Sequence, residues 1–138
     1  MDIDVIYRLF PDHDSCLSFL EQVRWEGGKP ECPYCGVASS CPMPKERRHH
    51  CNHCGTSFSV TVRTLFHKTH VDLQRWFYAL WLITDPNRKV SVRQLAALVG
   101  VNRNTAGLMI TRIRLALLEQ GKLPQRILAQ LANGKPQP

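Results

Sequence analysis

The chain has 138 residues and a formal net charge of +7, enough for one ordinary domain or two small ones. Residues 1–60 carry six Lys/Arg and eight Asp/Glu, a net −2, whereas residues 61–138 carry twelve Lys/Arg and three Asp/Glu, a net +9. A basic half of this kind favours a polyanionic partner, nucleic acid first, with a merely solvated surface as the alternative. The N-terminus lacks the pattern of a signal peptide, and the longest uncharged apolar stretch, 76–83, is too short to span a membrane, so we expect a cytoplasmic protein.

Residues 2–26 have the apolar spacing of helices, and Pro11 divides them into two. Asp14 or Ser15 is expected to cap the second helix. Cys16 falls in its apolar pattern and is expected to be a small buried hydrophobe. The predicted buried face of the second helix comprises Leu17, Phe19, Leu20 and Val23. We assign these N-terminal helices to residues 1–28.

Two Cys-x-x-Cys-Gly motifs follow, and fifteen residues separate the second Cys of the first motif from the first Cys of the second. That spacing is the reach of a short hairpin and predicts a tetrahedral zinc site, with two disulfides or a redox motif as alternatives. Four thiolates leave no open coordination position, so we expect one structural Zn²⁺ in a zinc ribbon over residues 29–62. The predicted ligands are Cys32, Cys35, Cys51 and Cys54.

Within the ribbon, prolines and cations between the motifs predict an exposed basic hairpin end, which is either a second nucleic-acid contact through Arg47 and Arg48 or a solvated loop. Cys41 lies in the same hairpin and receives no role. Apolar and polar residues alternate over 57–62, as in a half-buried strand.

Residues 63–120 are predicted to form a helical DNA-binding domain. Asp72 can cap a first helix with an aromatic buried face, which ends at 85–87. Ser91 and Gln94 form a capping box for the next helix, and Gly100 ends it. Asn102 can cap a following helix whose apolar residues keep helical spacing. Ala96 and Gly100 are four residues apart, and a small residue followed by a Gly at this spacing is typical of a helix-turn-helix. The alternative is an ordinary helical hairpin.

The polar side chains of this region suit DNA. Asn is suited to adenine, and Arg to guanine or phosphate. We expect the major groove to be faced by Arg103, Asn104, Gly107 and Thr111, and phosphates to be held by Arg88, Lys89, Arg93, Arg112 and Arg114. Thr105 is a further candidate for DNA binding. Residues 121–138 are expected to form a short helix and a flexible tail.

The order of motifs resembles the N-terminal region of bacterial insertion-sequence transposases, which place a zinc ribbon before a helix-turn-helix and ahead of a catalytic domain with Asp-Asp-Glu carboxylates. The matching stretches are CPYCG, HCNHCGTSFSVTVRTLF at 50–66 and SVRQLAALVGVNRNTAGLMITRIR at 91–114, and the likeness covers roughly 17–118. Two positions depart from the pattern: Arg63 stands where the family usually has Gly, and Gly107 where it usually has Trp. The resemblance implies a mainly α fold with a small β zinc ribbon.

A single acidic residue, Glu119, follows Asp85, whereas a two-metal nuclease site needs several carboxylates. We therefore expect no enzyme, but a transposase-derived, sequence-directed binder of double-stranded DNA in the bacterial cytoplasm, associated with the nucleoid, with transcriptional regulation as its use. The alternatives are the DNA-end-recognition part of a transposase and a protein-binding adaptor of the transcription machinery. A homodimer through residues 113–118 is a further alternative to their burial within one chain.

Overall fold

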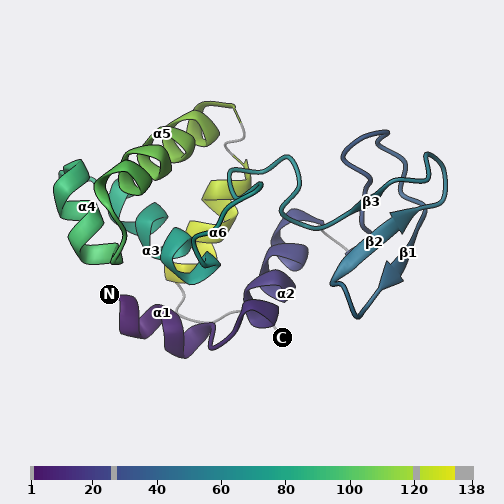
Figure 1. Ribbon diagram of the computed structural model, residues 1–138, viewed down its shortest axis with the longest axis horizontal. Helices are drawn as coiled ribbons and strands as arrows, with labels where there is room; N and C mark the ends of the chain where they lie inside the picture. The colour runs from purple at the N-terminus through teal and green to yellow at the C-terminus, as the bar shows by residue number, and fades with distance from the viewer. Residues whose placement is uncertain (1, 26–27, 120–121, 133–138) are drawn as a thin grey trace.

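The computed structural model describes residues 2–25, 28–119 and 122–132, and these form two parts, a helical body and a small sheet at its far end (Figure 1). The sheet is antiparallel, in the order β1-β2-β3. This architecture confirms the mainly α fold with a small β zinc ribbon. The helices are α1 (Ile3–Leu9), α2 (His13–Arg24), α3 (Leu73–Thr84), α4 (Val92–Val99), α5 (Arg103–Glu119) and α6 (Lys122–Ala132), and the strands are β1 (Ser40–Met43), β2 (Arg48–Cys51) and β3 (Ser57–Phe58).

The start of α2 differs from the prediction. Asp12, rather than Asp14 or Ser15, caps the helix: its carboxylate accepts the Ser15 backbone N–H at 2.8 Å, and the Ser15 hydroxyl accepts the Asp12 N–H at 3.3 Å. In a capping box the cap residue has an extended backbone and lies three residues before its partner. Asp12 meets this requirement, so Ser15 lies inside the first turn of the helix. The predicted buried face of α2 and the burial of Cys16 are confirmed.

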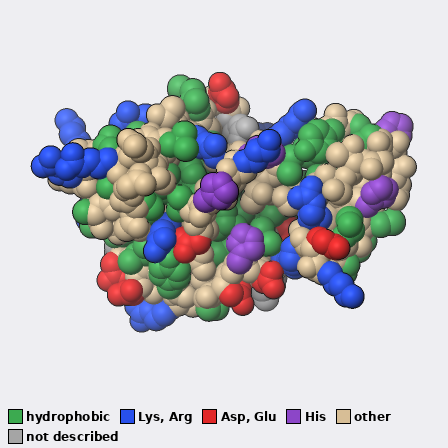
Figure 2. Space-filling view, viewed as in Figure 1, with side chains coloured by type: hydrophobic (Ala, Val, Ile, Leu, Met, Phe, Trp, Pro, Cys, Tyr) green, Lys and Arg blue, Asp and Glu red, His purple; other side chains and the backbone are tan. Residues whose placement is uncertain are grey.

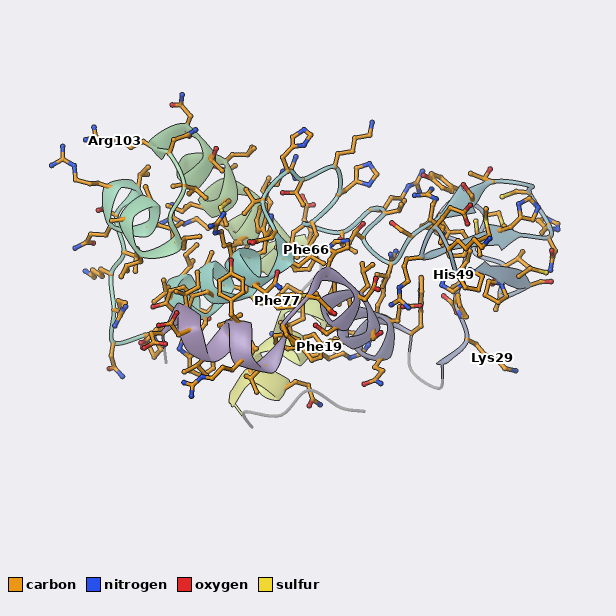
Figure 3. The ribbon with its side chains drawn as sticks, turned by 60° about the horizontal axis from the view of Figure 1, so that its bottom comes forward. Phe19, Lys29, His49, Phe66, Phe77 and Arg103 are labelled. Atoms are coloured by element: carbon orange, nitrogen blue, oxygen red, sulfur yellow. The ribbon has the colours of Figure 1, made fainter. Side chains whose placement is uncertain are left out.

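The helical body is built around a cluster of phenylalanines (Figure 3). Phe10, Phe19 and Phe77 have ring centroids 4.9 to 5.5 Å apart, and Phe66 lies 5.8 Å from Phe77. These rings come from the end of α1, from α2, from α3 and from the segment before α3. The N-terminal helices and the predicted DNA-binding region therefore share one apolar core.

The start of α3 is capped as predicted, since the Asp72 carboxylate accepts the Arg75 backbone N–H. The same residue also ties α3 to α1: the Tyr7 hydroxyl donates to Asp72 Oδ2 at 2.8 Å. A second tie comes from the buried Gln74, whose side-chain nitrogen donates to the Phe10 carbonyl at 2.9 Å. The N-terminal helices are thus fixed to α3 by hydrogen bonds as well as by packing.

The third strand is shorter than predicted. β3 ends at Phe58, where it pairs with β2 by placing Phe58 opposite His49. Beyond it the chain turns: the Val62 N–H donates to the Ser59 carbonyl at 3.2 Å, and the Arg24 guanidinium donates to the carbonyls of Val60 and Val62 at 2.7 and 2.8 Å. The prediction of a strand over 57–62 is wrong in length, although Val60 and Val62 are buried as the alternation indicated.

Residues 113–118 were expected either to form a dimer interface or to be buried within one chain, and the structure buries some of them and exposes others. Ile113 is fully buried, whereas Leu115 and Leu118 are 50% and 84% exposed. α6 packs against α2, α3 and α5 and buries Ile127 and Leu131. The predicted flexible tail, 133–138, lies outside the described residues. Among the helices that are described, none is long and apolar enough to cross a membrane.

Candidate functional site

The two Cys-x-x-Cys motifs fold into matching turns. The Gly36 N–H donates to the Cys32 carbonyl at 2.8 Å, and the Gly55 N–H donates to the Cys51 carbonyl at 3.0 Å. Both glycines have left-handed backbones, with φ of 78° and 77°. Other residues adopt this conformation only at a steric cost, which explains the Gly after each motif. Each turn leaves its two sulfurs on the same side.

The four sulfurs converge on one point. All four Sγ atoms lie within 4.8 Å of one another, with Cys32–Cys54 at 3.6 Å and Cys35–Cys51 at 3.5 Å. A zinc ion bound at Zn–S distances of about 2.3 Å holds its sulfurs about 3.8 Å apart in a tetrahedron, so the set fits the ion closely. The four cysteines form a zinc-ribbon site for one structural Zn²⁺, as predicted.

The chemistry of the cysteines agrees with metal binding. None of the six cysteines forms a disulfide in this structure: the Cys35 and Cys51 sulfurs lie 3.5 Å apart and those of Cys32 and Cys54 3.6 Å apart, well beyond an S–S bond of about 2.05 Å.

Hydrogen bonds from the Thr56 side chain and backbone lower the pKa of the Cys54 thiol to about 6. The pKa of Cys35 moves the other way, to about 12: a hydrogen bond from the Val37 backbone lowers it, but burial and hydrogen bonds with the other three cysteines of the cluster outweigh that contribution. A depressed pKa favours the thiolate, which is the form that ligates zinc. Cys41 lies outside the cluster, exposed, with its thiol 3.5 Å from the Asn52 side-chain oxygen.

The ribbon is fastened to α2 by charged and aromatic contacts. Glu21 accepts from Arg47 at 2.9 Å and lies 3.1 Å from the His49 ring. The ring of Trp25 lies 5.4 Å from that of His49 and 5.9 Å from that of Phe58. Figure 3 shows His49 at the junction of the sheet with the helical body. We call these contacts, together with those of Arg24, the ribbon–helix joint.

A further contact fastens the first cysteine turn to the segment that leaves the sheet. Arg63 donates to the Pro33 carbonyl at 3.0 Å, and its guanidinium lies 5.0 Å from the centre of the Tyr34 ring. Its backbone has φ of 59°. Gly adopts this left-handed conformation without strain, whereas Arg adopts it at a cost. The sequence departure at Arg63 therefore coincides with a real backbone constraint.

The second candidate site is the pair α4 and α5. Ser91 and Gln94 form the predicted capping box, and Gly100 ends α4 in a left-handed conformation with φ of 79°. The side chain of Asn102 accepts the Thr105 N–H at 2.8 Å and so caps α5 as predicted. The two helices pack against each other across this turn.

One face of α5 is uncovered. At 3.6 residues per turn, Arg103, Asn104, Thr111 and Arg114 fall within less than half of the helix circumference, and all four are exposed. Gly107 lies among them, and a Cβ added there would meet no atom within 4 Å. Figure 3 shows Arg103 at the outer end of the helical body. The opposite face is buried and consists of Ala106, Met109, Ile110, Ile113 and Ala116.

The remaining predicted DNA contacts divide into two groups. Arg88, Lys89 and Arg93 are exposed at and before the start of α4, whereas Thr105 is half-buried at the edge of the covered face of α5. Arg112 points inward, and its Nη1 donates to the His67 carbonyl at 2.9 Å.

The predicted contacts on the hairpin are also engaged within the molecule. Arg47 binds Glu21 and the Ser18 hydroxyl, and Arg48 donates to the Ser57 carbonyl at 3.1 Å. Sequence reasoning missed the joint residues Glu21 and Arg24, because their partners lie 26 to 38 residues away in the chain and leave no local pattern.

Comparisons with known proteins agree with the metal centre. Residues 11–57 match the family described as the transposase zinc-ribbon domain. An uncharacterized protein in the transposable element ISH50 of Halobacterium salinarum is 29% identical over 113 residues. That similarity covers 80% of this chain but only 37% of the relative's length, and no solved structure matches. The part of the chain that holds the four cysteines is therefore similar to the zinc ribbons of transposases.

Proposed function

We propose that this chain binds double-stranded DNA in a sequence-directed manner through α5, with the zinc ribbon fixed beside it. The observation that carries the proposal is the open first turn of α5, where Arg103 and Asn104 are exposed and no described element covers them. A helix of about 10–12 Å diameter enters a major groove about 12 Å wide. The net charge of +9 over residues 61–138 supports the same partner.

The exposed side chains provide base and phosphate contacts of different kinds. Asn104 offers the donor and acceptor that adenine requires, and Arg103 suits guanine or a phosphate. The Thr111 hydroxyl donates to the Gly107 carbonyl at 3.0 Å, which leaves its oxygen able to accept from a base. The absence of a side chain at Gly107 allows close approach of the helix backbone. Arg88, Lys89, Arg93 and Arg114 would hold phosphates, which fix register without reading sequence.

Two biological uses follow from the same binding chemistry. The chain is a transposase-derived regulator, or it is the end-recognition part of a transposase whose catalytic carboxylates lie elsewhere. The relationship to a protein of a transposable element supports either use. The scarcity of acidic residues after Asp85 supports a role in binding rather than in strand cleavage.

Selection of bound duplexes from a random-sequence pool, at near-physiological salt, tests the proposal. We expect an enriched motif, and we expect the variant Arg103→Ala/Asn104→Ala to lose it, since each base contact contributes about 1–3 kcal/mol. Lys29→Ala is the matched control, because this exposed lysine lies at the opposite end of the molecule from Arg103 (Figure 3). An enriched motif that survives the double variant would assign recognition to another element.

The position and symmetry of the enriched DNA motif distinguish end recognition by a transposase from transcriptional regulation. A motif repeated at both ends of a transposable element indicates end recognition, and one found near promoters indicates regulation. A two-fold motif with half-sites about one helical turn apart indicates a dimer. If duplexes are retained without an enriched motif, and their retention does not depend on salt, DNA binding is overturned and the protein-binding adaptor is favoured.

A further inference from the structure

The linker between the ribbon and α3, residues 59–72, is held against the side of α5. The Arg112 guanidinium donates to the His67 carbonyl, and the Arg63 backbone N–H donates to the His67 ring at 3.3 Å. One residue beyond Lys68, the Thr69 hydroxyl accepts from the indole of Trp76 at 2.8 Å. The segment therefore passes over the helical body between fixed points, and Lys68 stands between two anchored residues.

The tip of this linker presents basic side chains to solvent. Lys68 and His70 are exposed, and within the described part of the chain neither makes a side-chain hydrogen bond or an ion pair. Lys68 also borders the cleft that separates the linker from Arg47 and Arg48 of the hairpin. In Figure 2, Lys, Arg and His side chains gather on this face between α5 and the sheet.

The position of the linker relative to α5 matters for DNA. Arg112 lies at the border between the exposed and covered faces of α5, roughly 14 Å along the helix axis from Arg103. A helix seated in a groove about 12 Å wide has a phosphate strand on either side of it. A basic loop held beside the helix at this point meets one of those strands.

We propose that the linker tip, residues 67–70, is a second DNA contact, in which Lys68 binds a phosphate bordering the groove that α5 enters and His70 lies beside it. Arg112 acts as a positioning residue, because it holds the His67 carbonyl and so fixes the loop. Its charge was expected to contact phosphate directly, and Lys68 takes that role instead. The inference rests on the proposed DNA binding by α5.

The test compares affinity for a short mixed-sequence duplex over a range of salt concentrations, using the zinc-loaded full chain. Each phosphate contact contributes about 0.9 to the slope of log affinity against log salt. We expect Lys68→Ala to reduce the slope by about that amount while leaving the selected motif unchanged. Lys29→Ala, which removes an exposed lysine far from α5, should leave the slope unaltered.

The role of Arg112 is tested by additivity. If Arg112 only positions the loop, Arg112→Ala reduces the slope about as much as Lys68→Ala, and the double variant shows no further loss. An additive loss in the double variant would show that Arg112 itself contacts phosphate and would overturn the assignment. A thermal melt of each variant checks that α5 remains folded.

Failure of this inference differs from failure of the proposed function. If the unmodified protein shows no salt-dependent affinity, α5 does not bind DNA and both proposals fall. If it binds with a normal slope that Lys68→Ala does not change, DNA binding stands and the linker contact is refuted.

Discussion

The ribbon and the helical body reach a fixed structure by different means. The ribbon has three short strands and four converging sulfurs, and a segment of that size buries too little apolar surface to fold alone. The helical body has a phenylalanine cluster and helices with well-made caps. Metal binding therefore contributes folding free energy in one part, and apolar burial contributes it in the other. The comparison leads us to expect that one part can be unfolded without the other, although buried residues of both belong to one apolar cluster.

Loss of a metal ligand should have the largest effect. In Cys51→Ser we expect the ribbon to lose zinc and unfold, because structural zinc sites contribute about 10–16 kcal/mol to folding in small zinc domains. The helical body should keep most of its helical circular dichroism signal. Metal analysis and spectroscopy measure the two effects. Cys41→Ser is the control, since Cys41 lies outside the cluster, and it should retain one zinc per chain. Unchanged zinc content in Cys51→Ser would refute the four-cysteine site.

Truncation of a side chain in the phenylalanine cluster should have the opposite result: the helical body is destabilised and the ribbon keeps its zinc. Phe77 is fully buried, so Phe77→Ala should reduce the free energy of unfolding of the helical body by about 3–5 kcal/mol while zinc remains bound. Denaturant unfolding followed by helical signal measures the loss. Leu118→Ala removes a side chain that is 84% exposed and should change stability by less than about 0.5 kcal/mol. Release of zinc together with the helical signal would show that the two parts unfold as one.

The smallest effect is expected at the ribbon–helix joint. Glu21→Gln removes the charge that faces both Arg47 and His49 but preserves the side-chain size. Because these groups are partly exposed, we expect a loss of about 0.5–1 kcal/mol, with zinc content and helicity preserved. Glu46→Gln, an exposed acid at the hairpin turn, is the control. Equal stability of the two variants would show that the joint depends on its aromatic contacts.

The features that could be predicted from sequence are those set by short spacing. The ligand set follows from the two-residue gap and the Gly in each motif, and the caps of α4 and α5 follow from Ser91, Gln94 and Asn102. Each cap, and each pair of ligands within one motif, depends on atoms within a few residues of one another. Local chemistry decides such features, so tertiary packing does not override them.

The features that could not be predicted depend on partners far along the chain. The turn after β3 is held by Arg24, which donates to the carbonyls of Val60 and Val62 and lies 36 and 38 residues away from them in the chain. Arg112 has the appearance of a phosphate contact in the sequence, and only the fold brings the His67 carbonyl beside it. At the start of α2 the reason was local: the prediction offered Asp14 or Ser15 as the cap, whereas Asp12 forms the capping box with Ser15.

The ribbon–helix joint also determines how the two parts meet a common ligand. Arg24, Glu21 and Arg63 fasten the ribbon to elements of the helical body and its linker at several points. A flexible tether would give the second part an effective concentration that depends on linker length. A fastened joint instead fixes distance and direction. If α5 binds DNA as proposed, the two parts would approach the duplex as one body, and binding by one part would present the other at a single spacing along the helix axis of the DNA.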